Sequence, residues 1–191
     1  EITCRSQKRI LKTSCIGFNM RYHPIIAWLK KVISSEEDFI FNLSVGHDVT
    51  KWRKDRKAHN IFSLKKDSGG GAISELSHEI DLANYLLGQP LDNKLYSLND
   101  KLFGEVDSKT VILLKTKKGV GSINLDLVSP APHRSIELVN ESIYLKCDLN
   151  SGMVEGMLNQ KKLKKSFAIN RNLILKKSLL ESIQSLSSNS K

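Results

Sequence analysis

Residues 68–88 of this 191-residue chain read SGGGAISELSHEIDLANYLLG, and the rest of the sequence is interpreted outward from them. The segment opens with three consecutive glycines: Gly69, Gly70 and Gly71. Apolar residues at helical spacing follow, and Gly88 ends the pattern, so a helix is predicted over residues 72–87. Glycines before a helix let the backbone approach a ligand, and the free N–H groups there favour an anion. An ordinary tight loop is the alternative interpretation.

The predicted helix carries a candidate acid–base pair. Glu75 and His78 are three residues apart and therefore share a helix face. A carboxylate one turn from an imidazole can hold its tautomer and tune its pKa, as a general acid or base requires. The alternative is a structural histidine on a half-buried helix. No metal site is expected, because His78 and Asp81 supply only two ligands.

The remaining chain predicts two more helices and a series of strands. The helices are expected at residues 25–33, where Pro24 suits the first turn, and at residues 172–186. The strands are expected at residues 14–20, 39–45, 94–98, 109–116, 120–128, 134–139, 142–148 and 153–158. Because short turns join consecutive strands, the predicted fold class is α+β, an open, mainly antiparallel sheet with helices covering one face.

Composition excludes several classes of protein. About 40% of the residues are apolar, which is enough to form a core. The longest apolar run is only a few residues, so no membrane-spanning helix is expected. Three cysteines are too few for a disulfide framework or a zinc site. No export leader is recognised, and a cytoplasmic location is expected.

The chain is strongly basic, with 30 Lys and Arg residues against 20 Asp and Glu residues. Of the basic residues 23 are Lys, whereas nucleic-acid readers favour Arg, so no nucleic-acid partner is expected. A basic interaction protein that contacts nucleic acid remains an alternative. The densest cluster, residues 161–165 (KKLKK), is interpreted as a solvated turn, with a phosphate-binding or partner surface as the alternative.

GGGAISELSHEIDLANYLLG resembles the glycine run and Asp/His helix of the Gfo/Idh/MocA oxidoreductases, the glucose–fructose oxidoreductase and inositol dehydrogenase family. Residues 15–24 (CIGFNMRYHP) resemble the passage from that family's nucleotide-binding domain into its second domain. Trp52-Arg53 resembles the Trp-Arg of the loop before the glycines. Residues 109–129 (KTVILLKTKKGVGSINLDLVS) and 134–138 (RSIEL) resemble the large sheet. The resemblance covers about residues 14–150.

The resemblance implies a division of the chain and an activity. Residues 1–20 would be a remnant of the last Rossmann helix and strand, and residues 21–191 the substrate-binding and oligomerisation domain. Family members are sugar or polyol dehydrogenases that use NAD or NADP. The glycine-rich nucleotide turn and the family's catalytic Lys have no counterpart here, and the chain begins at Glu1 rather than Met. We therefore expect the cofactor to be bound mainly by a missing N-terminal domain. A non-catalytic remnant or binding module is the alternative.

The resemblance also assigns roles to residues. His78 matches the family's His and would be the general base, and Glu75 stands near the position of the family's Asp. Six further residues would lie near substrate or cofactor: Asn19, Arg21, Trp52, Gly69, Gly70 and Gly71. The alternatives are a salt bridge for Arg21 and a loop plug for Trp52, while His133 and Arg134 are weaker candidates at the sheet edge. The implied partners are a small sugar or polyol and further copies of the chain through the sheet face.

Overall fold

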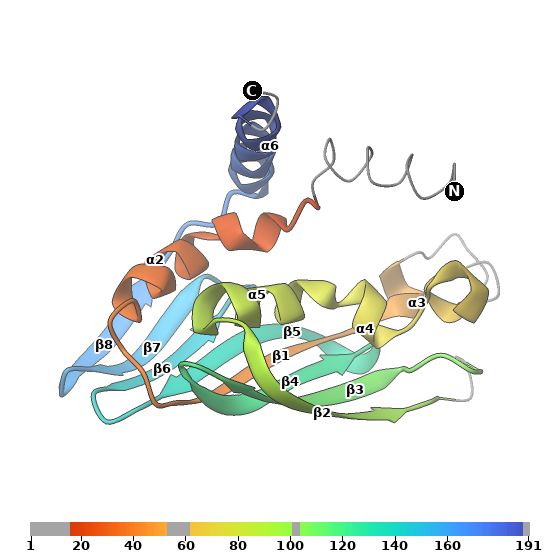
Figure 1. Ribbon diagram of the computed structural model, residues 1–191, viewed down its shortest axis with the longest axis horizontal. Coiled ribbons are helices and arrows are strands. Elements are labelled where there is room, and N and C mark those ends of the chain that lie inside the picture. Colours follow the sequence, from red (N-terminus) through yellow and green to blue (C-terminus); the bar gives the residue numbers. More distant parts are fainter. Residues whose placement is uncertain (1–15, 53–61, 101–103, 189–191) are drawn as a thin grey trace.

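The computed structural model describes residues 16–52, 62–100 and 104–188, and a single eight-stranded sheet organises them (Figure 1). The strands are β1 (Phe39–Asp48), β2 (Pro90–Leu98), β3 (Lys109–Thr116), β4 (Gly119–Asp126), β5 (Val128–Val139), β6 (Ile143–Asp148), β7 (Met153–Leu158) and β8 (Lys161–Ser166). The helices are α2 (Pro24–Val32), α3 (Val49–Trp52), α4 (Ala72–Glu75), α5 (Ser77–Leu87) and α6 (Arg171–Ser188), with 3₁₀ turns η1 (Asn19–Tyr22), η3 (Phe62–Leu64) and η4 (Lys66–Ser68).

The strand order is β2-β3-β4-β1-β5-β6-β7-β8. Strand β1 lies in the middle of the sheet and runs parallel to β4, while every other neighbouring pair is antiparallel. Helices α2 and α5 lie along one face, and α6 stands away from the sheet beside η1 (Figure 1). The predicted α+β class with a mainly antiparallel open sheet is confirmed.

The core lies between the sheet and α2 and α5. Alternate residues of β1, such as Phe41 and Leu43, are buried in the same core cluster as Leu29 of α2 and Leu82 of α5. Each fully buried side chain of this size contributes about 1.5–3 kcal/mol to folding. The packing fixes α5, and with it His78, over the centre of the sheet.

Three predictions of local structure are wrong. Within residues 16–20 of the predicted strand 14–20 no strand forms, because Asn19 begins the 3₁₀ turn that leads into Pro24; residues 14 and 15 lie outside the described part. The helix expected over 72–87 is divided at Leu76. The cluster 161–165 is not a turn but lies in edge strand β8, paired with β7.

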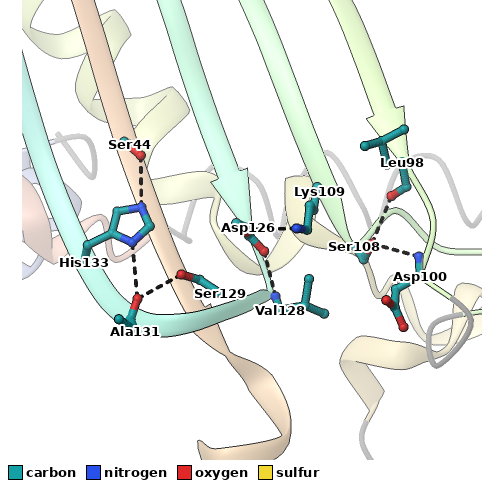
Figure 2. Close-up of polar contacts among 10 residues, drawn as sticks. All are labelled: Ser44, Leu98, Asp100, Ser108, Lys109, Asp126, Val128, Ser129, Ala131 and His133. Atoms are coloured by element: carbon teal, nitrogen blue, oxygen red, sulfur yellow. Dashed lines mark hydrogen bonds and ion pairs between the residues drawn. The ribbon is translucent and has the colours of Figure 1, made fainter.

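The face of the sheet away from the helices is open (Figure 1). Figure 2 shows polar contacts at one end of it, where His133 Nε2 lies 3.0 Å from Ser44 Oγ and Lys109 pairs with Asp126. His133 and Arg134 are neighbours on β5, so their side chains point to opposite faces. Arg134 lies on the helix side.

Candidate functional site

A cavity of about 530 Å³ lies where η1, α4, α5, β5 and α6 meet. Its lining residues are Asn19, Met20, His23, Glu75, His78, Arg134, Leu149, Asn150, Ile169, Arg171, Ile174 and Leu175. The cavity therefore brings together three of the predicted site residues, Asn19, Glu75 and His78. It also includes Arg134, one of the weaker candidates.

The break at Leu76 places the predicted pair on two short helices. Leu76 has backbone angles of φ −107° and ψ 26°, and its side chain is fully buried. We attribute the break to two separate anchors: α4 is held at its start by Asp107, and α5 is held by ion pairs of its own. Glu75 and His78 still line the same cavity, although no hydrogen bond joins them among the described contacts.

His78 is half-buried at the start of α5. Its ring meets that of Phe18 edge to face, with 5.8 Å between the centroids, and its Nδ1 atom is buried without a hydrogen-bond partner. Burial lowers the pKa of His78, and the charge of Arg134 lowers it further against the opposing effect of Asp81. The imidazole is therefore neutral at pH 7 and can accept a proton. Buried polar atoms without partners are uncommon and often functional.

Arg134 reaches the cavity from β5 and is held there by Glu79 of α5. Arg134 Nε lies 2.8 Å from Glu79 Oε1, and Nη2 lies 3.4 Å from Oε2. The Glu79 side chain is 2% exposed, so burial raises the pKa of this carboxyl while Arg134 opposes the shift. Removing Arg134 would leave the Glu79 carboxylate buried and unpaired. The pair fixes one wall of the cavity beside His78.

His23 also lines the cavity, but both of its ring nitrogens are used in the fold. Nδ1 accepts a hydrogen bond from the backbone N–H of Ile25 at 3.3 Å, which caps the start of α2. The proton of the neutral ring is therefore on Nε2, which donates to the carbonyl of Leu149 at 3.2 Å. His23 is thus a structural residue that orders the cavity wall.

Comparisons with known proteins add a fold assignment. No family model and no curated protein matches the chain in sequence. Among solved structures it is similar to levoglucosan dehydrogenase in complex with NADH, with a TM-score of 0.75 and 15% identity, covering 90% of this chain and 56% of that one. It is also similar to UDP-N-acetylglucosamine 3-dehydrogenase GnnA from Acidithiobacillus ferrooxidans (TM-score 0.71, 14% identity, 92% and 53% covered). A further neighbour is an inositol dehydrogenase homolog with NAD+ from Azotobacter vinelandii (TM-score 0.71, 10% identity, 91% and 53% covered).

The fold is that of the C-terminal domain of Gfo/Idh/MocA-type oxidoreductases. The chain spans only slightly more than half the length of these neighbours. At identities this low, the similarity concerns the fold.

In this Gfo/Idh/MocA-type fold the glycine run lies against a loop of the chain itself. The N–H of Ala72 donates to the carbonyl of Asp107 at 2.9 Å, and the N–H of Ile73 donates to Asp107 Oδ2 at 3.1 Å. Gly71 has φ +115°, and a Cβ there would lie 2.2 Å from Asp107 Oδ1. The anion at this helix start is therefore the Asp107 carboxylate. The three glycines are not among the residues that line the His78 cavity.

Arg21 forms a salt bridge, which is the alternative that the sequence analysis gives for this residue. It pairs with Asp81 of α5, with Nε 2.8 Å from Oδ2, and its guanidinium lies over the rings of Phe18 and Tyr85. Arg21 is not among the cavity-lining residues, and Asp81 is only 5% exposed. The pair anchors η1 to the helix that carries His78.

Trp52 ends the short helix α3, and neither its side chain nor Arg53 belongs to the described part of the chain. In residues 16–52, 62–100 and 104–188, no three His, Cys, Asp or Glu side chains are grouped so as to hold a metal ion. Among the same residues, no helix is both long and apolar enough to cross a membrane.

Proposed function

We propose that this chain is the substrate-binding half of an NAD(P)-dependent sugar or polyol dehydrogenase and that His78 is its general base. The observation that carries the proposal is the cavity that His78, neutral at pH 7, lines together with Glu75 and Asn19. The fold shared with levoglucosan dehydrogenase and the inositol dehydrogenase homolog supports it. Hydrogen-bond donors and acceptors both line the cavity, as a polyhydroxylated ligand needs.

The described residues do not fit a dinucleotide. They contain no glycine-rich nucleotide turn, and Asp107 occupies the N–H groups behind Gly71. The proposal therefore places the cofactor on a separate N-terminal domain, as the division near residue 20 implies. When bound there, the nicotinamide would accept hydride from the substrate carbon.

The chain's own contribution to the reaction is the movement of a proton. As a secondary alcohol becomes a ketone, the C–H bond breaks with its electron pair, and the O–H proton must leave at the same time. His78 accepts that proton and becomes imidazolium. Glu75 and Asn19 would orient the substrate hydroxyls, and Arg134 completes the polar wall.

Two assays test this proposal. In the enzyme carrying its nucleotide-binding half, His78→Ala is expected to lower turnover with its sugar or polyol substrate by about 100-fold or more, because the proton acceptor is lost. His133→Ala is the matched control, since His133 lies on the opposite sheet face, and it should leave turnover unchanged. Equal turnover in the His78 variant and the unmodified enzyme would remove His78 from the mechanism.

A binding titration tests whether the cofactor binds to a separate domain. This chain alone is expected not to bind NADH tightly, and fluorescence titration should give no saturation in the micromolar range. Micromolar NADH binding would contradict the placement of the cofactor on another domain.

We further propose that the open sheet face joins copies of the chain into a homo-oligomer. Large apolar side chains are exposed there, including Ile40 (66%), Tyr96 (60%), Leu113 (44%) and Val120 (49%). Such a patch on a soluble domain is typical of a protein interface. Lys109 and Asp126 on the same face pair with each other within the chain, so they add no unpaired charge to this apolar surface.

A further inference from the structure

The first turn of α6 forms part of the His78 cavity, although α6 is far from His78 in sequence. Arg171, Ile174 and Leu175 all line the cavity. Ile174 is 9% exposed, and the α6 residue Glu181 accepts a hydrogen bond from the Tyr22 hydroxyl at 3.0 Å. Helix α6 is therefore anchored on η1, and its start is held at the cavity.

Arg171 has no evident role in stabilising this helix. It is the first residue of α6, where the positive end of the helix dipole disfavours a cation. Its side chain is exposed, and no carboxylate of the described residues lies within 4 Å of its guanidinium. The N-terminal turn is instead capped by Asn170, whose Oδ1 accepts from the N–H of Leu173 at 3.1 Å.

A second guanidinium lines the same cavity with unused donors. Arg134 uses Nε and Nη2 on Glu79, but the described contact of Nη1 is with Met20 Sδ at 3.7 Å. A thioether is a weak acceptor, so the Nη1 hydrogens remain available for a ligand.

The charges around the cavity are unevenly distributed among its walls. Glu79 compensates the charge of Arg134, whereas no carboxylate of the described residues compensates Arg171 on α6. Glu75 is the one carboxylate that lines the cavity, it lies on α4, and it forms no ion pair with either arginine within the described contacts. His23 and His78 are neutral at pH 7, because burial lowers the pKa of both.

We propose that Arg171, assisted by the Nη1 hydrogens of Arg134, binds an oxyanion group on the substrate, either a carboxylate or a phosphate. The substrate is then an anionic sugar, such as a sugar acid or a sugar phosphate, rather than a neutral polyol. Guanidinium groups match the planar or tetrahedral oxygens of these groups through paired hydrogen bonds. This inference rests on the proposed function, because it identifies the substrate class of the same site.

The test compares three ligands on this chain by NMR titration: glucuronate, glucose 6-phosphate and glucose. One of the two anionic sugars is expected to bind about tenfold or more tightly than glucose, and the one that does identifies the group as carboxylate or phosphate. Arg171→Gln should remove that preference while leaving glucose binding unchanged. Lys176→Gln is the matched control, since it loses the same charge from the side of α6 opposite Ile174, and it should keep the preference.

The outcomes separate this inference from the proposed function. If glucose binds as well as both anionic sugars, or if Arg171→Gln keeps the preference, the anion site is wrong while a sugar-binding cavity stands. If none of the three sugars shifts the His78 ring signals, the anion site is overturned and the proposed function is contradicted as well.

Discussion

Arg134 is a charged residue that influences three histidines, the buried His23 and His47 and the half-buried His78. Burial is the main cause that lowers the pKa of each ring, and the positive charge of Arg134 adds to it. A lowered pKa means that the unfolded chain takes up protons before the folded chain does as the pH falls. Acid therefore favours unfolding through these three residues.

The pH dependence of stability follows from this sign. The free energy of unfolding is expected to rise from pH 5 to about pH 6.5, the ordinary histidine pKa, and to level off above pH 7. Glu79, whose pKa is raised, acts in the opposite direction above its ordinary pKa of 4.5, but it is one group against three. Urea denaturation at several pH values measures the slope. A free energy of unfolding that stays constant or falls between pH 5 and 6.5 would contradict it.

Gly71 is required by its contact with Asp107. Gly71→Ala places a Cβ 2.2 Å from Asp107 Oδ1 at a φ of +115°, and it is expected to cost about 2 kcal/mol or more of unfolding free energy. Gly17→Ala is the control, because a Cβ added at Gly17 would have no atom within 4 Å and the φ of Gly17 is not positive. Thermal and urea denaturation of both variants would show the difference, and equal stability would contradict this role.

At the scale of elements, Lys118 joins the β3–β4 turn to the end of α2. Its Nζ donates to the backbone carbonyls of Ile33, Ser34 and Glu36 at 2.6, 2.8 and 3.1 Å. These carbonyls belong to the C-cap residue of α2 and to the residues that follow it, and a cation at the C-terminal end of a helix is favourable.

Lys118→Met keeps the apolar stem and removes these hydrogen bonds. It is expected to lower the free energy of unfolding by about 1–3 kcal/mol, because charge-assisted bonds contribute this much. Lys117→Met, an exposed change in the same turn, should have little effect. Urea denaturation of both variants measures the difference, and equal stability of the two variants would contradict this role of Lys118.

The elements differ in how far sequence could predict them. Strand β3 was predicted because buried Thr110, Ile112 and Leu114 alternate with exposed residues. Strand β8 was missed because KKLKK has little strand propensity. Its lysines are typical of an edge strand, where charge prevents pairing with a strand of another molecule. The break at Leu76 was missed because the anchors to which we attribute it, Asp107 for α4 and the arginines paired with α5, lie far from Leu76 in sequence.

The candidate site shows the same limit. Glu75 and His78 could be predicted as a pair because helical spacing is local. Arg171 could not be predicted, because its position at the cavity depends on the packing of α6 on η1, a contact between the two ends of the described chain. Arg134 could be placed only once the alternation of β5 was fixed, because the neighbouring His133 faces the other way.

At the scale of the whole molecule, the sheet has one covered face and one open face. Leu113→Asp together with Val120→Asp puts charge on the open face over β3 and β4, and it is expected to dissociate the proposed homo-oligomer. Sedimentation velocity should show the unmodified chain as a dimer or larger and this variant as a monomer. Leu179→Asp, on exposed α6, is the control and should leave the assembly unchanged. A monomeric unmodified chain would contradict the interface.

The central claim is that substrate meets His78 in the cavity between α5 and α6. A crystal structure with a bound sugar tests it most directly. The account predicts a sugar hydroxyl within about 3 Å of a His78 ring nitrogen, with the ring of the sugar between α4 and the start of α6. A sugar bound elsewhere, or bound in this cavity with no oxygen near His78, would contradict it.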